Sequence, residues 1–576
     1  MSRDDRATLF HGGRVVTMRE DGAVAEAIVV RDGRVVATGA EQDMRAAAGD
    51  HARTVDLAGA TVMPGLVDTH PHLIHWNGIK RSVVDLSDCR DHGEIAARIG
   101  AAAARTPKGQ WIRCSPVGEP HYFLRRSYRD LAEGELPTRR LLDAAAPDHP
   151  VWIQAWAPVN PAVTVLSTRG LWNIQVSRNT PDRVGRVSVE KDADGEPTGR
   201  LLGPVNNYYN NEPWWDSVLA RIDGVSPEDW YEGARSGMAE ANRGGVTTVF
   251  EGHMMDWPLI DVYRQHGNAG TLTTRVLCTP DAEPHGLPTS VPLTEAELVQ
   301  RLELAHRVQD LSGDLFRTES FLCSRGGPFN PGMMILNRSH RGPYGEWTKG
   351  VEFIPEWKGR LMVEFAAERG MRMNLISVAD REHDVALEHL ETARRRFGDF
   401  SDRQWTLQHA YFMTDEQCRR YRDLGFQLTT STSFSHFKMH TFRERLGSDS
   451  LRDLIPLRRE LDHGFEVGCG TDWGPSNVFE HIAFAQTHRG VFGDRNDGPA
   501  QVISREQALA TWTRSAARVL RWEGIGTLEA GKHADLIVVD RDPLTTPTDD
   551  LKDTRVHLTM LGGRPVHDEG VLHDVL

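Results

Sequence analysis

Eight short apolar stretches, each with the length and composition of a buried β-strand, recur through the middle of this chain. They are Val62–His72, Gly245–Glu251, Leu272–Thr279, Asp314–Cys323, Met371–Ala379, Gln404–Phe412, Gly425–Phe434 and Phe465–Asp472. Stretches with helical periodicity separate most of them, such as Pro227–Asn242, Thr294–Gln309, Asp384–Phe397 and Asp415–Leu424. Strands that alternate with helices form parallel sheets with helices packed on the faces. The pattern therefore predicts an α/β fold, a (β/α)₈ barrel of the TIM type.

Both ends of the chain differ from its middle, because they contain short strands and turns. Asp32-Gly33 is a two-residue hairpin signal, and the tail carries strand-like runs at Asp535–Asp540 and Val556–Leu561. We expect residues 1–60 and 523–576 to form the two parts of one composite β-sandwich. Residues 61–76 then hold the first barrel strand, and residues 226–522 hold the remainder of the barrel. A capping box, Ser504 with Gln507, starts one of its last helices.

Residues 77–225 do not fit this alternation. A strand-to-helix connection usually takes a few residues, so a segment of this length predicts an inserted subdomain, which we expect to act as a lid on the barrel. It includes an aromatic, asparagine-rich patch at Asn206–Trp215.

Composition narrows the class of protein. The 576 residues carry 81 acidic against 67 basic side chains, a formal net charge of −14, which argues against nucleic acid as the main partner. Apolar runs fall short of the roughly 18 residues that cross a bilayer, and the first ten residues lack the apolar core of a signal peptide. The six cysteines form no CxxC pair. We expect a cytoplasmic protein that binds a small-molecule substrate and no membrane; a homodimer remains one option.

The sharpest motif is the run Pro64–His72 (PGLVDTHPH). Residues i and i+2 of a strand point to the same face, so His70 and His72 project together at the carboxyl end of the first barrel strand. Active sites of such barrels lie at that end, and two adjacent imidazoles suit a divalent metal ion. The alternative is a pair of unrelated core or surface histidines.

Carboxylates follow the two strands predicted to flank this one. If the barrel closes, Asp472, after the eighth run, sits beside the histidine pair, where it could bind the metal and accept a proton from water. Its alternative role is capping the next helix. Glu251 and His253 end the second run and are further potential ligands; alternatively they pair with each other or with an arginine. His409 ends the sixth run and could bind a second metal, polarise a substrate carbonyl, or be a core histidine.

Aromatic residues near these strand ends suggest an apolar or aromatic substrate. The predicted substrate contacts are Trp473, Phe434, His436 and Trp156, and Trp152 and the Tyr208–Trp215 cluster could add to the same pocket. The alternative for that cluster is ordinary packing inside the insertion.

Taken together, these motifs resemble the amidohydrolase superfamily. The matching stretches are Pro64–His72, His409, Gly470–Asp472 and the tail Gly526–Leu536. Further stretches resemble the branch that includes N-substituted formamide deformylase: Val84–Leu86, Gly109–Ile112, Leu136–Arg139, Ala146–Pro150 and Gly195–Gly199. The resemblance implies a metal-dependent barrel with a composite β-sandwich, in which an activated hydroxide attacks an amide or related carbon.

Two positions depart from the pattern of that superfamily. Its two-metal site uses a carboxylated lysine on strand four and a histidine on strand five, where this chain has Leu315 and Ile376. Neither side chain can coordinate a cation. We therefore predict one divalent ion, zinc first with manganese or iron as alternatives, held by His70, His72 and Asp472. Glu251 or His253 could complete the shell, and Glu319 is a weaker candidate.

The preferred function is hydrolysis of a non-peptide C–N bond, amide- or formamide-like, with Asp472 and His409 as catalytic residues. A second hypothesis is a lyase, decarboxylase or isomerase on a reduced metal site. A third is a metal-free binding protein. Fold alone does not decide among them.

Overall fold

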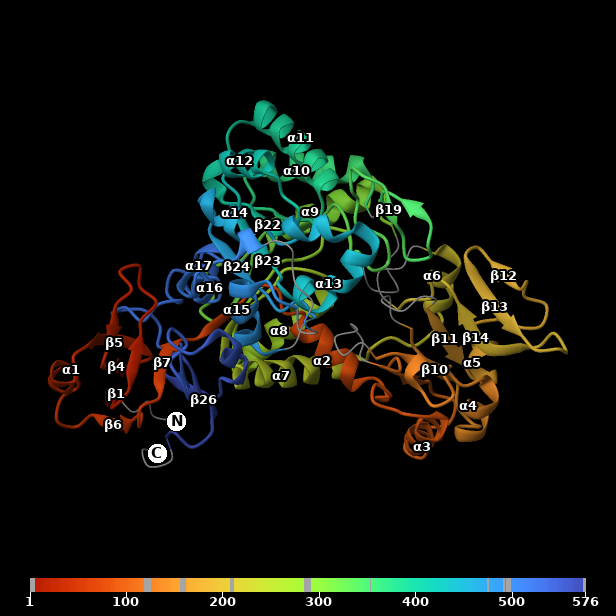
Figure 1. The fold of residues 1–576 in the computed structure, drawn as a ribbon, viewed down its shortest axis with the longest axis horizontal. Helices are drawn as coiled ribbons and strands as arrows, with labels where there is room; N and C mark the ends of the chain where they lie inside the picture. Colours follow the sequence, from red (N-terminus) through yellow and green to blue (C-terminus); the bar gives the residue numbers. More distant parts are fainter. Residues whose placement is uncertain are drawn as a thin grey trace.

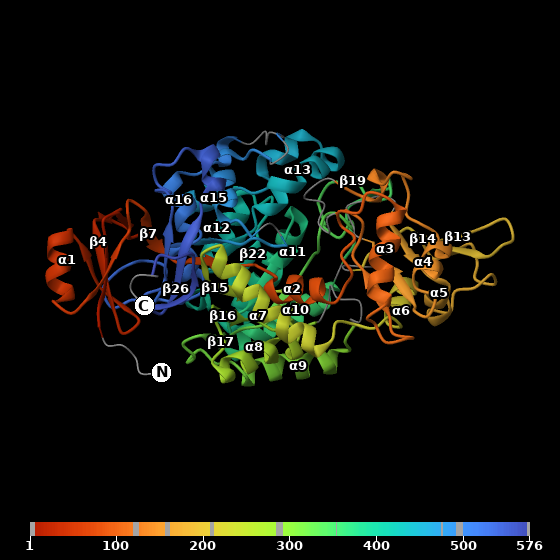
Figure 2. The same ribbon diagram turned by 90° about the horizontal axis from the view of Figure 1, so that it is seen from below.

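The structure is a computed structural model that describes residues 6–118, 126–155, 162–207, 212–283, 292–352, 354–473, 476–490, 493 and 499–572, with the backbone alone at residues 434, 435 and 437. Three bodies follow one another along its longest axis (Figure 1): a sandwich of sheets, a central α/β body and an inserted sheet with its own helices. Figure 2 shows the inserted body again at the end opposite the sandwich. The molecule is thus a mixed α/β fold.

Strands from both ends of the sequence share the sandwich, where red and blue ribbons meet in Figure 1. One sheet has the order β5 (Arg34–Gly39), β4 (Ala27–Arg31), β1 (Thr8–His11), β6 (Arg53–Asp56). The other has the order β27 (Arg564–Asp568), β26 (Val556–Leu561), β25 (Leu536–Val539), β7 (Thr61–Pro64), β2 (Arg14–Val16), β3 (Val24–Ala25). Because β25 pairs with β7, the tail is held by main-chain bonds to the segment that leads into the first parallel strand.

The hairpin predicted at Asp32-Gly33 is confirmed. β4 and β5 pair with Arg31 opposite Arg34, and the two turn residues have φ of 52° and 75°, the left-handed values that a tight hairpin turn requires. A Cβ atom at Gly33 would lie 2.7 Å from the carbonyl oxygen of Gly562, so this turn also needs glycine for close approach.

The central body holds nine parallel strands in two sheets. The first has the order β17 (Phe316–Thr318), β16 (Arg275–Cys278), β15 (Val246–Glu251), β8 (Leu66–Asp68). The second has the order β18 (Leu322–Ser324), β21 (Asn374–Ser377), β22 (Thr406–His409), β23 (Gln427–Thr430), β24 (Val467–Cys469). In the described residues these hydrogen-bonded ladders do not join into one closed sheet.

Helices surround these sheets (Figures 1 and 2), as expected for parallel strands buried on both faces. They are α2 (Leu73–Arg81), α7 (Pro227–Arg243), α8 (Trp257–Ala269), α9 (Glu295–Arg307), α10 (Glu356–Arg369), α11 (Asp380–Phe397), α12 (Asp415–Asp423), α13 (Ser433–Leu446), α14 (Leu457–Asp462), α15 (Val478–Thr487), α16 (Arg505–Ala510) and α17 (Arg514–Val519). The helix α1 (Glu41–Ala48) lies on the sandwich, and β19 (His340–Arg341) with β20 (Trp347–Thr348) forms a small hairpin. Within the described ranges, every helix is too short or too polar to span a membrane.

The run Asp314–Cys323, expected to be a single strand, is two strands instead. Ser320 has a φ of 62°, which breaks the extended chain, so β17 pairs with β16 while β18 pairs with β21. The physical reason lies just before the break. The Glu319 carboxylate is buried and paired with Arg372 at 3.0 Å and Arg521 at 3.0 Å, which fixes a turn where the apolar pattern predicted continuity.

The insertion has its own six-stranded sheet. Its order is β12 (Arg183–Val184), β13 (Val187–Lys191), β14 (Pro197–Leu202), β11 (Val163–Leu166), β10 (Val151–Ile153), β9 (Ile112–Cys114), with α3 (His92–Ala103), α4 (Arg139–Ala145), α5 (Thr168–Asn173) and α6 (Pro213–Leu219). Trp152 and Trp215 are buried in the core of this body, and their indole N–H groups donate to Thr164 and Asn206. The expectation that these two side chains line a substrate pocket is therefore wrong.

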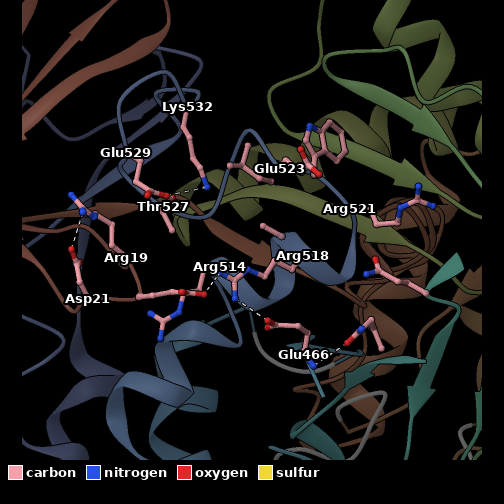
Figure 3. A pocket seen from close by; sticks show the side chains of 16 residues that line it. Arg19, Asp21, Glu466, Arg514, Arg518, Arg521, Glu523, Thr527, Glu529 and Lys532 are labelled. Carbon is pink, nitrogen blue, oxygen red and sulfur yellow. Dashed lines mark hydrogen bonds and ion pairs between the residues drawn. The ribbon is translucent and has the colours of Figure 1, made fainter. Parts of the chain in front are cut away.

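A cavity of about 760 Å³ lies where the sandwich meets the amino ends of the parallel strands (Figure 3). Gln404, Gln427 and Glu466, which precede or begin β22, β23 and β24, line it. Its five cationic side chains all have carboxylate partners: Arg19–Asp21, Arg514–Glu506, Arg518–Glu20 and Glu466, Arg521–Glu319, and Lys532–Glu529. Of these ion pairs, Arg518–Glu20 joins the α/β body to the sandwich.

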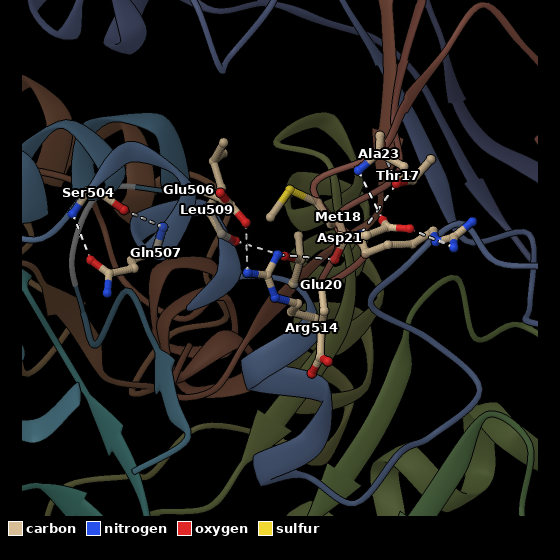
Figure 4. Close-up of polar contacts among 12 residues, drawn as sticks. Thr17, Met18, Glu20, Asp21, Ala23, Ser504, Glu506, Gln507, Leu509 and Arg514 are labelled. Atoms are coloured by element: carbon tan, nitrogen blue, oxygen red, sulfur yellow. Dashed lines mark hydrogen bonds and ion pairs between the residues drawn. The ribbon is translucent and has the colours of Figure 1, made fainter. Parts of the chain in front are cut away.

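Figure 4 shows how the sandwich is tied to the helices beneath the parallel sheets. Arg514 donates to the carbonyl oxygen of Met18 at 3.2 Å and to Glu506. Nearby, the predicted capping box at Ser504 and Gln507 is confirmed by both of its hydrogen bonds. The sandwich is therefore bonded to Arg514 at the start of α17, and the preceding helix, α16, begins with the capping box.

Candidate metal and active site

The segment after β8 places the two motif histidines. The Asp68 carboxylate accepts bonds from the backbone N–H of His70 at 3.0 Å, the backbone N–H of Thr471 at 3.1 Å and the Thr471 hydroxyl at 2.7 Å. Asp68 thus joins the chain after β8 to the chain after β24. Gly470 permits the approach, since a Cβ atom there would lie 2.6 Å from the backbone nitrogen of His70.

His70, His72 and Asp472 form one buried group of potential ligands. The Nε2 atoms of the two histidines are 3.1 Å apart, and Oδ1 of Asp472 lies 3.7 Å from Nε2 of His70 and 3.4 Å from Nε2 of His72. Tetrahedral bonds of about 2.1 Å put neighbouring ligand atoms about 3.4 Å apart. The three separations bracket that value, so these residues fit a divalent ion.

The electrostatics of the group agree with that fit. Burial holds the pKa of His70 and of His72 well below the usual histidine range, so both rings are neutral at pH 7 and keep a lone pair for a metal. The Oδ2 atom of Asp472 is buried without a hydrogen-bond partner among the described residues. A buried carboxylate oxygen without a donor is costly unless a cation or a water satisfies it.

His409, the last residue of β22, also faces this group. Its ring lies 4.8 Å from that of His70, and its Nδ1 atom lies 3.7 Å from Oδ2 of Asp472. Nδ1 is 3.3 Å from the Tyr411 hydroxyl, which itself donates to the Ser431 carbonyl at 2.9 Å. Because the hydroxyl proton is used there, Nδ1 carries the His409 proton and Nε2 is the acceptor nitrogen. The polarisation of a substrate carbonyl by His409 stays a prediction.

Of the two potential ligands at the end of β15, Glu251 and His253, the structure brings only one to the histidine pair. His253 faces the group, with ring centroids 5.6 Å from His70 and 5.3 Å from His72. Glu251 does not join it: its Oε1 atom accepts from the Tyr263 hydroxyl at 2.7 Å and from the backbone N–H of Ile74 at 3.1 Å. Burial raises the pKa of Glu251 to about 7. The prediction of Glu251 as a ligand therefore gives way to a role at the amino end of α2, where a carboxylate satisfies free N–H groups.

Glu319 is also diverted from a metal. Both of its oxygens pair with arginines, as described above, and Arg372 in turn donates to the Gln404 carbonyl near the amino end of β22. The structure also shows where the two apolar residues lie that stand in place of the superfamily's second-metal ligands. Leu315 precedes β17, at the amino end of that strand, and Ile376 is buried in β21.

Strained backbone gathers at the carboxyl ends of the strands. Non-glycine residues with left-handed φ include His72 (49°), Met254 (59°), His409 (69°), Asp472 (44°) and Trp473 (55°). Each such residue costs of order 1–3 kcal/mol and persists when surrounding contacts hold it. The clustering of this strain at one end of the sheets marks that end as the functional one.

The predicted substrate contacts are only partly placed. Trp473 stacks on His72 with ring centroids 4.6 Å apart and 20° between the planes. His436 lies on α13, its Nδ1 atom 3.1 Å from the Arg489 carbonyl. Trp156 lies outside the described residues, and so does the side chain of Phe434.

Three contributors were missed at the level of sequence. Asp68 stood inside the quoted motif, where a buried carboxylate two residues before a histidine was a usable signal. Tyr263 and Tyr411 gave no signal, because their roles depend on where the fold places their hydroxyls relative to the Glu251 carboxylate and the Ser431 carbonyl.

The sequence pattern of the amidohydrolase family matches residues 53–567. The chain belongs to the amidohydrolase family. It is 24% identical to N-substituted formamide deformylase of Arthrobacter pascens over 97% of this chain and 98% of that protein, and 24% identical to a putative amidohydrolase of Bacillus subtilis over 97% and 99%.

Solved structures share the fold of this amidohydrolase. An uncharacterised metal-dependent hydrolase from Pyrococcus horikoshii superposes with a TM-score of 0.72 at 20% identity, covering 94% of this chain and 99% of that one. A zinc complex of atrazine chlorohydrolase from Arthrobacter aurescens gives 0.53 at 17% identity, covering 98% of each. As an amidohydrolase, the chain is a hydrolase of carbon–nitrogen bonds other than peptide bonds.

Proposed function

We propose that this amidohydrolase uses one divalent metal ion, zinc in the first instance, to hydrolyse an amide- or formamide-like bond of a small apolar or aromatic molecule. The observation that carries the proposal is the buried triangle of Nε2 of His70, Nε2 of His72 and Oδ1 of Asp472, with sides of 3.1, 3.4 and 3.7 Å. The name of the formamide deformylase to which the chain is similar supports the bond type.

His70 and His72 would hold the ion, with Asp472 and His253 as the candidates to complete its shell. When bound, the ion would lower the pKa of a coordinated water toward neutrality. Asp472 then accepts the proton of the attacking water and passes it to the leaving nitrogen, so that water and amide become acid and amine. His409 lies beside the Asp472 carboxylate, with its Nδ1 atom 3.7 Å from Oδ2.

A single ion is supported by the residues that a second ion would lack. Of the family-type ligands for that ion, only His409 is present, and Leu315 and Ile376 offer no lone pair. Both are packed in the apolar core around the strands.

We also propose that the two parallel sheets act as one (β/α)₈ barrel. In support, the Thr69 N–H donates to the Cys469 carbonyl at 3.1 Å, which bridges the ends of β8 and β24. On the other side, Asp281 and Leu322 form an isolated bridge between the chain after β16 and β18. With β17 and β18 counted as one bent strand, the ring has the predicted eight members.

The aromatic substrate class rests on the surroundings of Trp473. It packs with Ile79 and Met254, and the partly exposed Trp76 and Trp230 lie against this cluster. A wall of indole rings next to His72 would favour a flat apolar group beside the scissile bond.

Hydrolysis of a panel of aryl- and alkyl-substituted formamides by the zinc-loaded enzyme tests the proposal. We expect turnover, solvent ¹⁸O in the acid product, and a loss of about 10³-fold in kcat for Asp472→Asn. The matched control is Asp540→Asn in the sandwich. Turnover without solvent oxygen would indicate a lyase or isomerase, and ligand binding unaffected by chelators would indicate a binding protein.

A further inference from the structure

The segment that carries His409 is strained along most of its length. His409, Ala410 and Phe412 have φ of 69°, 56° and 57°, all left-handed values that non-glycine residues avoid. Such a segment keeps its shape only if neighbouring groups hold it. The groups that hold residues 409–412 therefore decide where the His409 ring lies relative to Asp472.

Most of the bonds to this segment come from adjacent strands. The Thr430 hydroxyl donates to the His409 carbonyl at 2.8 Å, and the Ala410 N–H donates to the Ser377 carbonyl at 3.2 Å. The bond to the Tyr411 carbonyl comes from farther away. It is made at 3.0 Å by Nε2 of His383, a fully buried histidine on α11.

The protonation of His383 follows from its partners. A carbonyl oxygen only accepts, so Nε2 carries the proton. Nδ1 is then the acceptor, and it lies 2.9 Å from the Ser377 hydroxyl and 3.3 Å from the Tyr421 hydroxyl. Burial lowers the pKa of His383 to about 4, so this neutral ring is the form present at pH 7. Both ring nitrogens are thus used, and the ring direction is fixed.

We propose that His383 is a positioning residue of this enzyme: its Nε2–H bond to the Tyr411 carbonyl holds the left-handed 409–412 segment so that His409 faces Asp472. The inference rests on the proposed function for its kinetic consequence. The Tyr411 hydroxyl is the second element of the same arrangement, since it accepts from His409 Nδ1 while the Tyr411 carbonyl accepts from His383. Among the described residues, His383 bonds to Ser377, Tyr421 and Tyr411, and none of these is a proposed metal ligand.

Three variants separate positioning from simple packing. His383→Leu removes the donor, and His383→Gln places an amide N–H close to where Nε2 was. The matched control is His266→Leu on α8, because His266 is equally buried, with Nε2 at 3.0 Å from the Tyr231 carbonyl and Nδ1 at 2.8 Å from the Thr271 hydroxyl. Both leucine variants lose the same kind of bond, one behind the site and one away from it.

Hydrogen exchange measured by mass spectrometry on a peptide covering residues 406–413 gives the first readout, and it needs no substrate. We expect about tenfold faster exchange in His383→Leu, with near wild-type exchange in His383→Gln and His266→Leu. With a hydrolysed formamide in hand, kcat should fall about tenfold in His383→Leu at unchanged KM and zinc content, and recover in His383→Gln.

Unchanged exchange in His383→Leu would overturn the proposal, and so would faster exchange with an unchanged kcat. An equal kcat loss in His266→Leu would reduce the effect to general destabilisation. If the wild-type enzyme hydrolyses no formamide, the proposed function fails, whereas the exchange experiment still decides whether His383 holds the segment.

Discussion

The backbone N–H of Asp472 donates a hydrogen bond of 2.7 Å to the carbonyl oxygen of His70. This bond joins the ends of β8 and β24 at the point where both residues offer ligand atoms to the same space. Asp68 reinforces the contact, because its carboxylate accepts from the backbone N–H groups of both His70 and Thr471. The position of the carboxylate relative to the imidazoles is thus set by main-chain bonds, and the left-handed φ of 44° at Asp472 is held by them.

Removal of an imidazole should remove the ion. We expect purified enzyme reconstituted with zinc to hold about one ion per chain, and His72→Ala to hold almost none, with kcat/KM lowered by about 10³-fold. His75→Ala is the matched control, since His75 is a buried neighbour whose Nε2 atom lies 3.0 Å from the Met254 carbonyl. Elemental analysis after dialysis checks this. Two tightly held ions per wild-type chain would refute the single-ion proposal.

Glu251→Gln should leave the metal content unchanged. The amide oxygen can still accept from Tyr263 and from the Ile74 N–H, so the start of α2 is preserved. Glu251→Ala should cost about 1–3 kcal/mol in unfolding free energy, because two buried donors lose their acceptor. Zinc titration and urea unfolding of both variants measure this. A weaker zinc affinity in the glutamine variant would return Glu251 to the ligand shell.

Asp68→Ala should weaken metal binding without removing a ligand. Loss of its three accepted bonds frees the contact between the His70 and Thr471 segments, and supporting residues of this kind typically change metal affinity by about 10–100-fold. Asp68→Asn should be milder, because the amide oxygen still accepts and the Thr471 hydroxyl can turn to accept from the amide. Competition with a chelator gives the affinities. Equal zinc affinity in wild type and Asp68→Ala would contradict the positioning role.

Glu460 should make stability fall as pH rises. Burial raises its pKa to about 8, and both carboxyl oxygens lack a hydrogen-bond partner among the described residues. The folded state therefore keeps a proton that the unfolded chain releases near pH 4.3. Its contribution to stability is fully present below about pH 4.3 and is lost as pH rises to about 8, by at most about 1.4 kcal/mol per pH unit.

Glu460→Gln removes this dependence, so the variant should gain stability relative to wild type between pH 5 and pH 8. Urea unfolding at several pH values measures the difference. The exposed Glu416→Gln on α12 serves as control and should run parallel to wild type. Parallel curves for Glu460→Gln as well would show that Glu460 is ionised in the folded protein.

Local patterns predicted a large part of this structure. The strands β25 and β26, the Asp32-Gly33 hairpin and the Ser504 capping box were readable because each depends on residues within a few positions of one another. The break between β17 and β18 at Ser320 could not be predicted from the sequence. It depends on Glu319 finding Arg372 and Arg521, which are distant in sequence, and the apolar pattern around it is the same with or without that ion pair.

The extended geometry expected for the histidine pair does not hold, since β8 ends at Asp68 and His72 has a left-handed φ of 49°. For the site, the sequence by itself still determined that His70 and His72 follow the same strand and lie close together, because a single residue separates them. It also supplied the carboxylates and histidines that could join them. Only the tertiary structure decided between them: Asp68 and Thr471, 403 residues apart, are bonded and bring Asp472 to the pair, while Tyr263 and the start of α2 take Glu251 away. The physical reason is competition, since a carboxylate goes to whichever buried donors or cations the fold places within reach.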